Sequence, residues 1–135
     1  MQLRTGVDVV EIGRFERLNA NIKPRFLKRV FTPQELEKCG LSNASLAGRF
    51  AVKEAVAKAL QTGIGPVSWQ EIETVEGPAG EPLLVLHGEA ARLAERLGLH
   101  TWSISISHTS TLALAVAIAL SEPSVTGPTN LPEMG

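Results

Sequence analysis

Two carboxylates and a lysine are the first candidates for chemistry in this sequence. Glu54 and Lys58 lie four residues apart in an alanine-rich stretch that predicts a helix, so they share one helix face. Taken alone, that spacing is more typical of a surface ion pair than of a catalytic pair. Asp8 differs because it interrupts a valine-rich run that predicts a strand, where an unpaired carboxylate is costly. Asp8 is therefore expected to bind a metal ion, a neighbouring loop or an arginine.

Oxygen ligands of this kind suit a hard cation. Magnesium in phosphate-handling enzymes takes one or two carboxylates, and waters and substrate phosphates complete the octahedron. Asp8 and Glu54 could supply both carboxylates if the strand and the helix pack side by side. Lys58, one turn further along the helix, could then reach the same phosphates. Residue spacing alone does not establish this packing.

The other candidates are weaker when each is taken alone. His108 stands where a predicted strand turns, a place that often bears binding residues, although a turn histidine is more often simply solvated. Gly63 and Gly65 follow the long helix, so they do not form a helix-N-terminal phosphate loop, but they could let a ligand approach the backbone. Cys39 is the only cysteine, which excludes an internal disulfide, and a small packed residue is the simpler interpretation.

Composition indicates one globular domain. The chain has 135 residues, of which 44% are hydrophobic, and a formal net charge of −1. The longest nearly apolar run, at 112–120, is too short to span a bilayer, and the first residues lack the apolar stretch of a signal peptide. We therefore expect a cytoplasmic protein without a membrane partner.

Charge is distributed unevenly along the chain. Residues 11–31 contain six basic and two acidic side chains, which leaves a net charge of +4 in this segment. A basic segment on a nearly neutral protein predicts an acidic partner or a phosphate-rich ligand.

Hydrophobic periodicity and turn residues predict the elements that must position these side chains. Strands are expected at 4–10, 69–75, 83–86, 102–107 and 113–120. Helices are expected at 12–18, from Pro24, from Thr32 to Gly40, at 45–61 and at 89–97. Gly63 and Gly65 are expected to stop the long helix.

Segregated strands and helices predict an α+β fold of antiparallel strands packed with helices. Its single domain would cover residues 1–120, followed by a disordered tail at 121–135 that is rich in proline and glycine. The last strand is expected to be more fully buried than the one before it. Its alternate alanines, from Ala113 to Ala119, could pack under the long helix or at a subunit boundary.

Three sequence blocks, in order, carry a family resemblance. The first is GVDVVEIGR at 6–14, the second runs from FTPQE at 31–35 to RFAVKEAVAKAL at 49–60, and the third is SISHT at 105–109, before an alanine-rich strand. Their order and spacing resemble the small holo-acyl-carrier-protein synthases, the short trimeric class of 4'-phosphopantetheinyl transferases. The resemblance covers about residues 3–120 and implies the fold of that family.

The resemblance also implies roles for individual residues. Asp8 and Glu54 would be the magnesium ligands, and Lys58 would contact the phosphates of coenzyme A. The residues that would line the coenzyme A pocket are Arg49, Lys58, Gly63, Gly65, His108 and Thr109. The residues that would dock an acidic acyl carrier protein are Arg14, Arg25 and Arg29. Residues 19–22 lie where the family varies in length and content, so no docking arginine is assigned there.

The activity implied by the resemblance is transfer of 4'-phosphopantetheine from coenzyme A to a serine of apo-acyl carrier protein. The serine hydroxyl would attack the β-phosphorus and release adenosine 3',5'-bisphosphate. Catalysis would rest on Asp8, Glu54 and Lys58, with Glu54 accepting the serine proton directly or through water. The family forms homotrimers whose active sites lie between subunits.

Two alternatives stay open at this stage. A basic nucleic-acid-binding module could use the segment at 11–31, but the chain has no tyrosine and few aromatic residues alternate with these charges. A purely structural trimer could keep the fold without the activity, although Asp8, Glu54 and Lys58 are all present.

Overall fold

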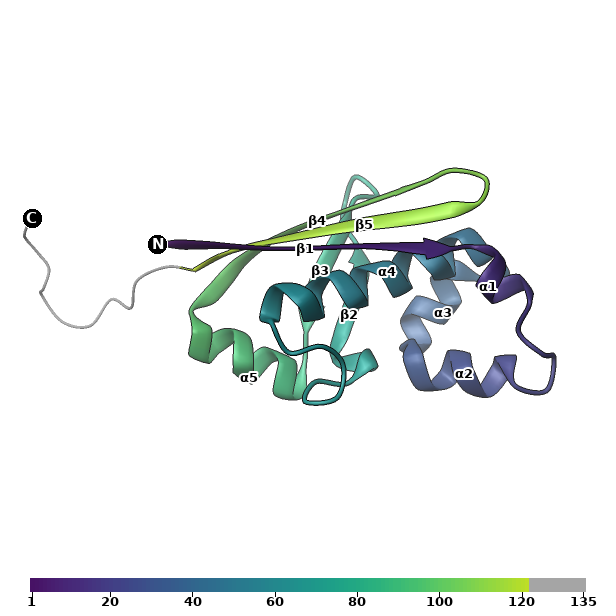
Figure 1. The fold of residues 1–135 in the computed structure, drawn as a ribbon, viewed down its shortest axis with the longest axis horizontal. Coiled ribbons are helices and arrows are strands. Elements are labelled where there is room, and N and C mark those ends of the chain that lie inside the picture. Colours follow the sequence, from purple (N-terminus) through teal and green to yellow (C-terminus); the bar gives the residue numbers. More distant parts are fainter. Residues whose placement is uncertain (122–135) are drawn as a thin grey trace, which may run out of the picture.

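Helices and strands are mixed along the chain in the computed structural model, which describes residues 1–121 (Figure 1). The strands are β1 (Gln2–Glu11), β2 (Ile72–Glu76), β3 (Pro82–Leu86), β4 (Leu99–His108) and β5 (Leu112–Ser121). The helices are α1 (Gly13–Glu16), α2 (Lys23–Val30), α3 (Pro33–Cys39), α4 (Asn43–Leu60) and α5 (Gly88–Leu97), with a 3-10 turn, η1 (Trp69–Glu71). All strand pairs are antiparallel, which confirms the predicted α+β fold.

The larger sheet has the order β1-β5-β4, so β1 and β4 are its two edges. Helix α4 lies along one face of this sheet and contacts all three strands (Figure 1). Strands β2 and β3 form a separate hairpin that contacts α4 and β4. At the level of the candidate site, Asp8 of β1 and Ile106 of β4 flank Ala115 of β5.

Small residues allow α4 to lie very close to the sheet. The alternate alanines of β5 that face the helix are fully buried, as are Ala51 and Ala55 of α4. Gly6 of β1 faces the helix too, and a Cβ atom built there would lie 1.8 Å from the carbonyl oxygen of Ala55. Because side chains alternate along a strand, Gly6 and Asp8 share this face, so the close approach brings Asp8 beside α4. Packing under the chain's own helix is therefore confirmed for the β5 alanines.

The opposite face of the same sheet is exposed, and over β1 and β5 it is apolar. Strand β5 is more buried than β4, which confirms the expectation, but its burial alternates along the strand. Its outer face carries Leu114 and Ile118, which are 37% and 40% exposed. Beside them on β1, Val7 and Val9 are 50% and 53% exposed. Within residues 1–121, nothing covers this face at β1 and β5.

Two predicted element boundaries also differ. Residues 69–71 form η1 rather than the start of a strand, because Glu71 accepts from the backbone amide of Ser68 at 2.9 Å and closes a tight turn. Helix α4 ends at Leu60, and the left-handed residue that terminates it is Gln61, with φ of 62°, rather than a glycine. The predicted capping box at Thr32 and Glu35 is confirmed.

No helix within residues 1–121 is both long and apolar enough to cross a bilayer. Ser121 is the last residue of β5. The rest of the predicted tail, at 122–135, falls outside the described residues, so the expectation of disorder there stays a prediction.

We predict that Gly6→Ala strongly destabilises the fold. The added methyl group must push α4 away from β1, and overpacking of this kind costs about 1–3 kcal/mol or more. Chemical denaturation followed by circular dichroism would measure the loss. Gly13→Ala is a matched control, because its added methyl group meets chiefly the end of the Arg17 side chain, which can move aside. Equal stability of the two variants would contradict the close packing of α4 on β1.

Candidate functional site

The first part of the candidate site lies where β1 meets α4. The ammonium of Lys58 donates to the Asp8 carboxylate at 3.2 Å and to the carbonyl oxygen of Val7 at 2.8 Å. The side chain of Asp8 is 18% exposed, whereas that of Lys58 is 53% exposed. The strand carboxylate is thus paired with the helix lysine rather than with a neighbouring loop or an arginine. The side-by-side packing of strand and helix, which the sequence left open, is observed.

Glu54 belongs to the same group. It lies one turn before Lys58 on α4 and is half-buried. Burial raises the pKa of its carboxyl group, and the negative charge of Asp8 raises it further, against the opposing effect of Lys58 and Arg14. Asp8 is thus close enough to Glu54 to disfavour ionisation of the Glu54 carboxyl group.

Two mutually repelling carboxylates are a suitable donor set for a divalent cation. Within residues 1–121, no cluster of three or more His, Cys, Asp or Glu side chains could hold a metal by itself. Asp8 and Glu54 instead offer hard oxygen ligands and leave coordination positions for water and substrate phosphate, which is how magnesium is usually held. A cation bound between them would also relieve the repulsion that raises the pKa of Glu54.

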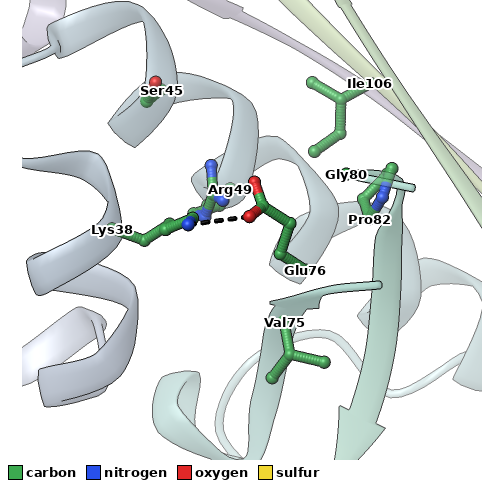
Figure 2. Close-up of a pocket in the computed structure, with 8 residues that line it drawn as sticks. All are labelled: Lys38, Ser45, Arg49, Val75, Glu76, Gly80, Pro82 and Ile106. Carbon is green, nitrogen blue, oxygen red and sulfur yellow. Dashed lines mark ion pairs between the residues drawn. The ribbon is translucent and has the colours of Figure 1, made fainter. Parts of the chain in front are cut away.

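Arg49 lines a separate pocket on another face of α4 (Figure 2). This pocket has a volume of about 300 Å³ and is lined by Lys38, Ser45, Arg49, Val75, Glu76, Gly80, Pro82 and Ile106. Lys38 and Glu76 form an ion pair of 2.7 Å beside Arg49. The Nε atom of Arg49 is buried and lacks a hydrogen-bond partner among the described residues. The pocket thus combines positive charge with unused hydrogen-bonding capacity, which suits an anionic group.

His108 and Thr109 lie at the exposed end of β4. Thr109 Oγ1 accepts from the backbone amides of Thr111 and Leu112 at 3.2 and 3.0 Å, so this hydroxyl holds the β4–β5 turn. Strand β5 lies between β4 and β1, so His108 and Asp8 stand on strands that are about 10 Å apart. The predicted coenzyme A residues therefore form at least two separate groups within a subunit.

Gly65 and Arg29 share a cavity, although the sequence assigned them to different ligands. The cavity has a volume of about 400 Å³ and is lined by Arg29, Ile64, Gly65, Val67, Ser68, Trp69 and Gln70. Gly63 and Gly65 both have positive φ, at 69° and 142°, and open space where a side chain would stand. Backbone at these positions is accessible to a ligand, as predicted from the glycines.

The arginines assigned to docking lie on the surface of α1 and α2. Arg14 and Arg25 are exposed, and the Arg14 guanidinium stands 5.5 Å from the centre of the Phe50 ring. Arg14 also borders a small hollow of about 70 Å³ that is otherwise apolar, lined by Phe15, Leu18 and Phe26. A positive charge beside an apolar hollow suits an acidic partner that places an apolar side chain in the hollow.

Sequence reasoning missed three charged residues near these sites. Lys38 and Glu76 flank Arg49 but come from elements far apart in sequence, so no local motif indicates them. Lys53 is completely buried beside Glu54. Its signal was present, because Lys53 shares a helix face with apolar residues at helical spacing, namely Leu46, Phe50, Val56 and Leu60.

Comparison with known proteins places this fold and site in a family. The family model for the 4'-phosphopantetheinyl transferase superfamily matches residues 4–117. The holo-[acyl-carrier-protein] synthase of Moorella thermoacetica is 47% identical over 109 residues, which cover 78% of this chain and 84% of that relative. The corresponding protein of Herpetosiphon aurantiacus is 44% identical over 114 residues, covering 79% of this chain and 90% of that relative.

Solved structures agree with this assignment. The Helicobacter pylori holo-[acyl-carrier-protein] synthase in complex with coenzyme A has a TM-score of 0.78 at 37% identity, covering 86% of this chain and 99% of that one. The holo-(acyl-carrier-protein) synthase of Bacillus anthracis, in complex with CoA (3',5'-ADP), has a TM-score of 0.71 at 32% identity, covering 88% of this chain and 96% of that one. The chain belongs to the 4'-phosphopantetheinyl transferase superfamily.

We predict that the Glu54 carboxyl group titrates above its ordinary pKa of 4.5. Asp8→Asn removes a charge that raises this pKa, so the midpoint should fall, whereas Lys58→Met removes a charge that lowers it, so the midpoint should rise. Carboxyl 13C NMR titrations of the metal-free protein would measure both shifts. Glu89 serves as an internal control, because hydrogen bonds from Arg92 and Arg96 lower its pKa. Shifts of Glu54 in the same direction in both variants would contradict this geometry.

Proposed function

We propose that this chain is a holo-acyl-carrier-protein synthase. It transfers 4'-phosphopantetheine from coenzyme A to a serine of apo-acyl carrier protein and releases adenosine 3',5'-bisphosphate. The observation that carries the proposal is the meeting of Asp8, Glu54 and Lys58 at the contact between β1 and α4, in a member of this superfamily. The relatives named above carry this activity in their names, and two of the solved ones were crystallised with coenzyme A or its nucleotide.

Magnesium is part of the proposal. Asp8 and Glu54 would hold the ion, which when bound supplies positive charge against the leaving phosphate. Lys58 is the residue of the chain that would add positive charge beside the same phosphate. Its ammonium stands 3.2 Å from Asp8, and its side chain is exposed enough to turn toward a substrate phosphate. Glu54 is the candidate group to take the serine proton, directly or through a metal-bound water. Because a carboxylate that also holds a metal ion is a weak base, the route through water is favoured.

Coenzyme A is proposed to be held by the residues that the family resemblance suggested. Arg49, with its buried and unpartnered Nε, would bind an anionic group of the nucleotide, near His108 and Thr109. The open backbone at Gly63 and Gly65 would border the nucleotide. Arg14, Arg25 and Arg29 would face the acidic carrier protein, although Arg29 also shares a cavity with Gly65 and could reach the nucleotide.

A homotrimer with shared sites is the proposed assembly. The exposed apolar face of the β1-β5-β4 sheet, with Leu114, Ile118, Val7 and Val9, is a surface that association would cover. Asp8 and His108 lie on opposite edges of this sheet, so a site that uses both is more readily built from two neighbouring subunits than from one. The alanines of β5 play no part in that surface, because they face α4.

The comparisons do not support the alternative of a nucleic-acid-binding module. Each relative and solved structure named above is a holo-acyl-carrier-protein synthase, and the matching family model describes a transferase. The cytoplasmic location expected from the sequence stays a prediction.

We predict that Asp8→Ala and Glu54→Ala each lower transfer by at least about 100-fold and leave the fold intact. Each change removes a proposed metal ligand, and α4 tolerates alanine well. Mass spectrometry of apo-carrier protein incubated with coenzyme A would follow the added phosphopantetheine. Glu37→Ala, which removes an exposed glutamate from α3, is the control and should retain activity. Near-normal turnover of either site variant at saturating magnesium would refute the two-carboxylate site.

We predict that Arg14→Glu raises the KM for carrier protein about tenfold and leaves the KM for coenzyme A nearly unchanged. Surface charge acts chiefly on encounter and orientation of a charged partner, so rising salt should also raise the wild-type KM for carrier protein. Steady-state kinetics with each substrate varied would separate the two constants. Arg92→Glu on α5 is a control of equal charge change. A change in the coenzyme A constant alone would place Arg14 in the nucleotide pocket instead.

We predict that two inactive variants restore activity when their subunits mix. If one site takes Glu54 from one subunit and His108 from its neighbour, a trimer of Glu54→Ala and His108→Ala subunits contains some sites with both native residues. Activity of the exchanged mixture should then exceed that of either variant alone. Light scattering would establish the oligomeric state. A fully active monomer would refute the shared site, and a trimer without complementation would place both residues on one chain.

A further inference from the structure

Lys53 is the fully buried charged residue next to the proposed metal ligand Glu54. Its side chain is 0% exposed, and its ammonium makes three hydrogen bonds. It donates to Glu35 Oε1 at 2.8 Å, to the carbonyl oxygen of Trp69 at 3.0 Å and to that of Ile72 at 2.6 Å. Since an ammonium has three donors, its hydrogen-bonding capacity is fully used.

The acceptor Glu35 is itself held in place. Its Oε1 atom accepts from the backbone amide of Thr32 at 3.0 Å, within the capping box of α3. Its Oε2 atom accepts from the backbone amide of Thr74 in β2 at 2.9 Å. The Lys53 ammonium is thus bound to three elements that surround α4, namely α3, η1 and β2.

Helix α4 is also held by packing contacts. Against the sheet it presents small residues, including Gly48, Ala51 and Ala55, and larger side chains such as Phe50 pack in the core. Contacts of this kind constrain the helix through shape and have no preferred direction of their own. Lys53 is different, because its three directional hydrogen bonds require one orientation of the helix.

The orientation of α4 matters because Glu54 follows Lys53 directly. With side chains, a helix has a radius of about 5–6 Å, so a rotation of about 20° moves a side-chain end by about 2 Å. Metal coordination tolerates errors of only about 0.2 Å in ligand distances. A small rotation of α4 would therefore move Glu54 away from the position it needs opposite Asp8.

We propose that Lys53 is a positioning residue whose buried hydrogen bonds set the rotation of α4 and so hold Glu54 opposite Asp8 for metal binding. This inference rests on the proposed magnesium site. The three acceptor oxygens around Nζ favour an ammonium at this position, and holding it there has the cost of desolvating a charge. Three hydrophobic contacts could stabilise the same position without desolvating a charge, but they would not impose the same directionality.

The test compares Mn²⁺ binding, measured by electron paramagnetic resonance on metal-free protein, in a set of variants. Lys53→Met alone would strand the buried Glu35 carboxylate, so the informative protein is the double variant Lys53→Met with Glu35→Gln, which replaces both charges with side chains of similar shape. We expect its Mn²⁺ affinity to fall at least about tenfold, in line with losses that follow removal of groups orienting a metal ligand. Its kcat should fall as well, while its KM for carrier protein stays within about twofold.

Two controls separate positioning from stability. Leu99→Ala removes a buried side chain at the start of β4, opposite Ser121 and away from the β1–α4 contact, so it should lower the Tm without weakening Mn²⁺ binding. Glu35→Gln alone keeps Lys53 and its two carbonyl contacts and should bind Mn²⁺ within about threefold of the wild type.

Several results would overturn the positioning role of Lys53. One is a folded double variant that binds Mn²⁺ like the wild type. Another is a loss of Mn²⁺ affinity in Leu99→Ala as large as that in the double variant, when the two proteins lose the same amount of Tm. A third is a loss of Mn²⁺ affinity in Glu35→Gln alone that is as large as that in the double variant. Failure of the proposed metal site looks different, because Glu54→Ala would then bind Mn²⁺ as tightly as the wild type.

Discussion

The rest of the structure depends on the close approach of α4 to the β1-β5-β4 sheet. That approach requires Gly6, whose missing side chain leaves room for the carbonyl oxygen of Ala55, and the buried alanines of β5. Only at this distance can the side chains of Glu54 and Lys58 meet a carboxylate that belongs to a strand. The small residues therefore do more than fill a core, because they set the separation between the two parts of the candidate site.

Helix α4 serves several sites through different faces. Glu54 and Lys58 face β1, Arg49 faces the pocket beside β2 and β3, and Lys53 reaches into the interior toward α3. Successive residues on a helix point about 100° apart, so neighbours such as Lys53 and Glu54 can have entirely different surroundings. This arrangement lets one rigid element hold groups with separate tasks at fixed relative positions. It also means that any change in the rotation of α4 would affect all of them together.

Much of this arrangement could be predicted from the sequence. The parts that could not be predicted depend on tertiary packing or on exceptions to local rules. Periodicity placed α4 and the shared face of Glu54 and Lys58, because a helix repeat is a local property. The exposure of the outer residues of β5 could not be predicted, because apolar residues such as Leu114 and Ile118 indicate burial without saying whether their own chain or another supplies the cover. The end of α4 lies within one residue of the predicted position, but the residue that terminates it was misassigned, because Gln61 adopts the left-handed conformation that usually indicates glycine. The pocket around Arg49 depends on Lys38 and Glu76, whose meeting is decided by tertiary packing alone.

The bond from Lys58 to the carbonyl oxygen of Val7 has a consequence for solubility. Strand β1 is an edge of its sheet, and edge strands expose unpaired carbonyl and amide groups that can recruit a strand from another molecule. By occupying one of these carbonyl groups at 2.8 Å, the lysine places a charge where an incoming strand would have to pair. The side chain proposed to serve phosphate chemistry therefore also protects the chain against edge-to-edge aggregation.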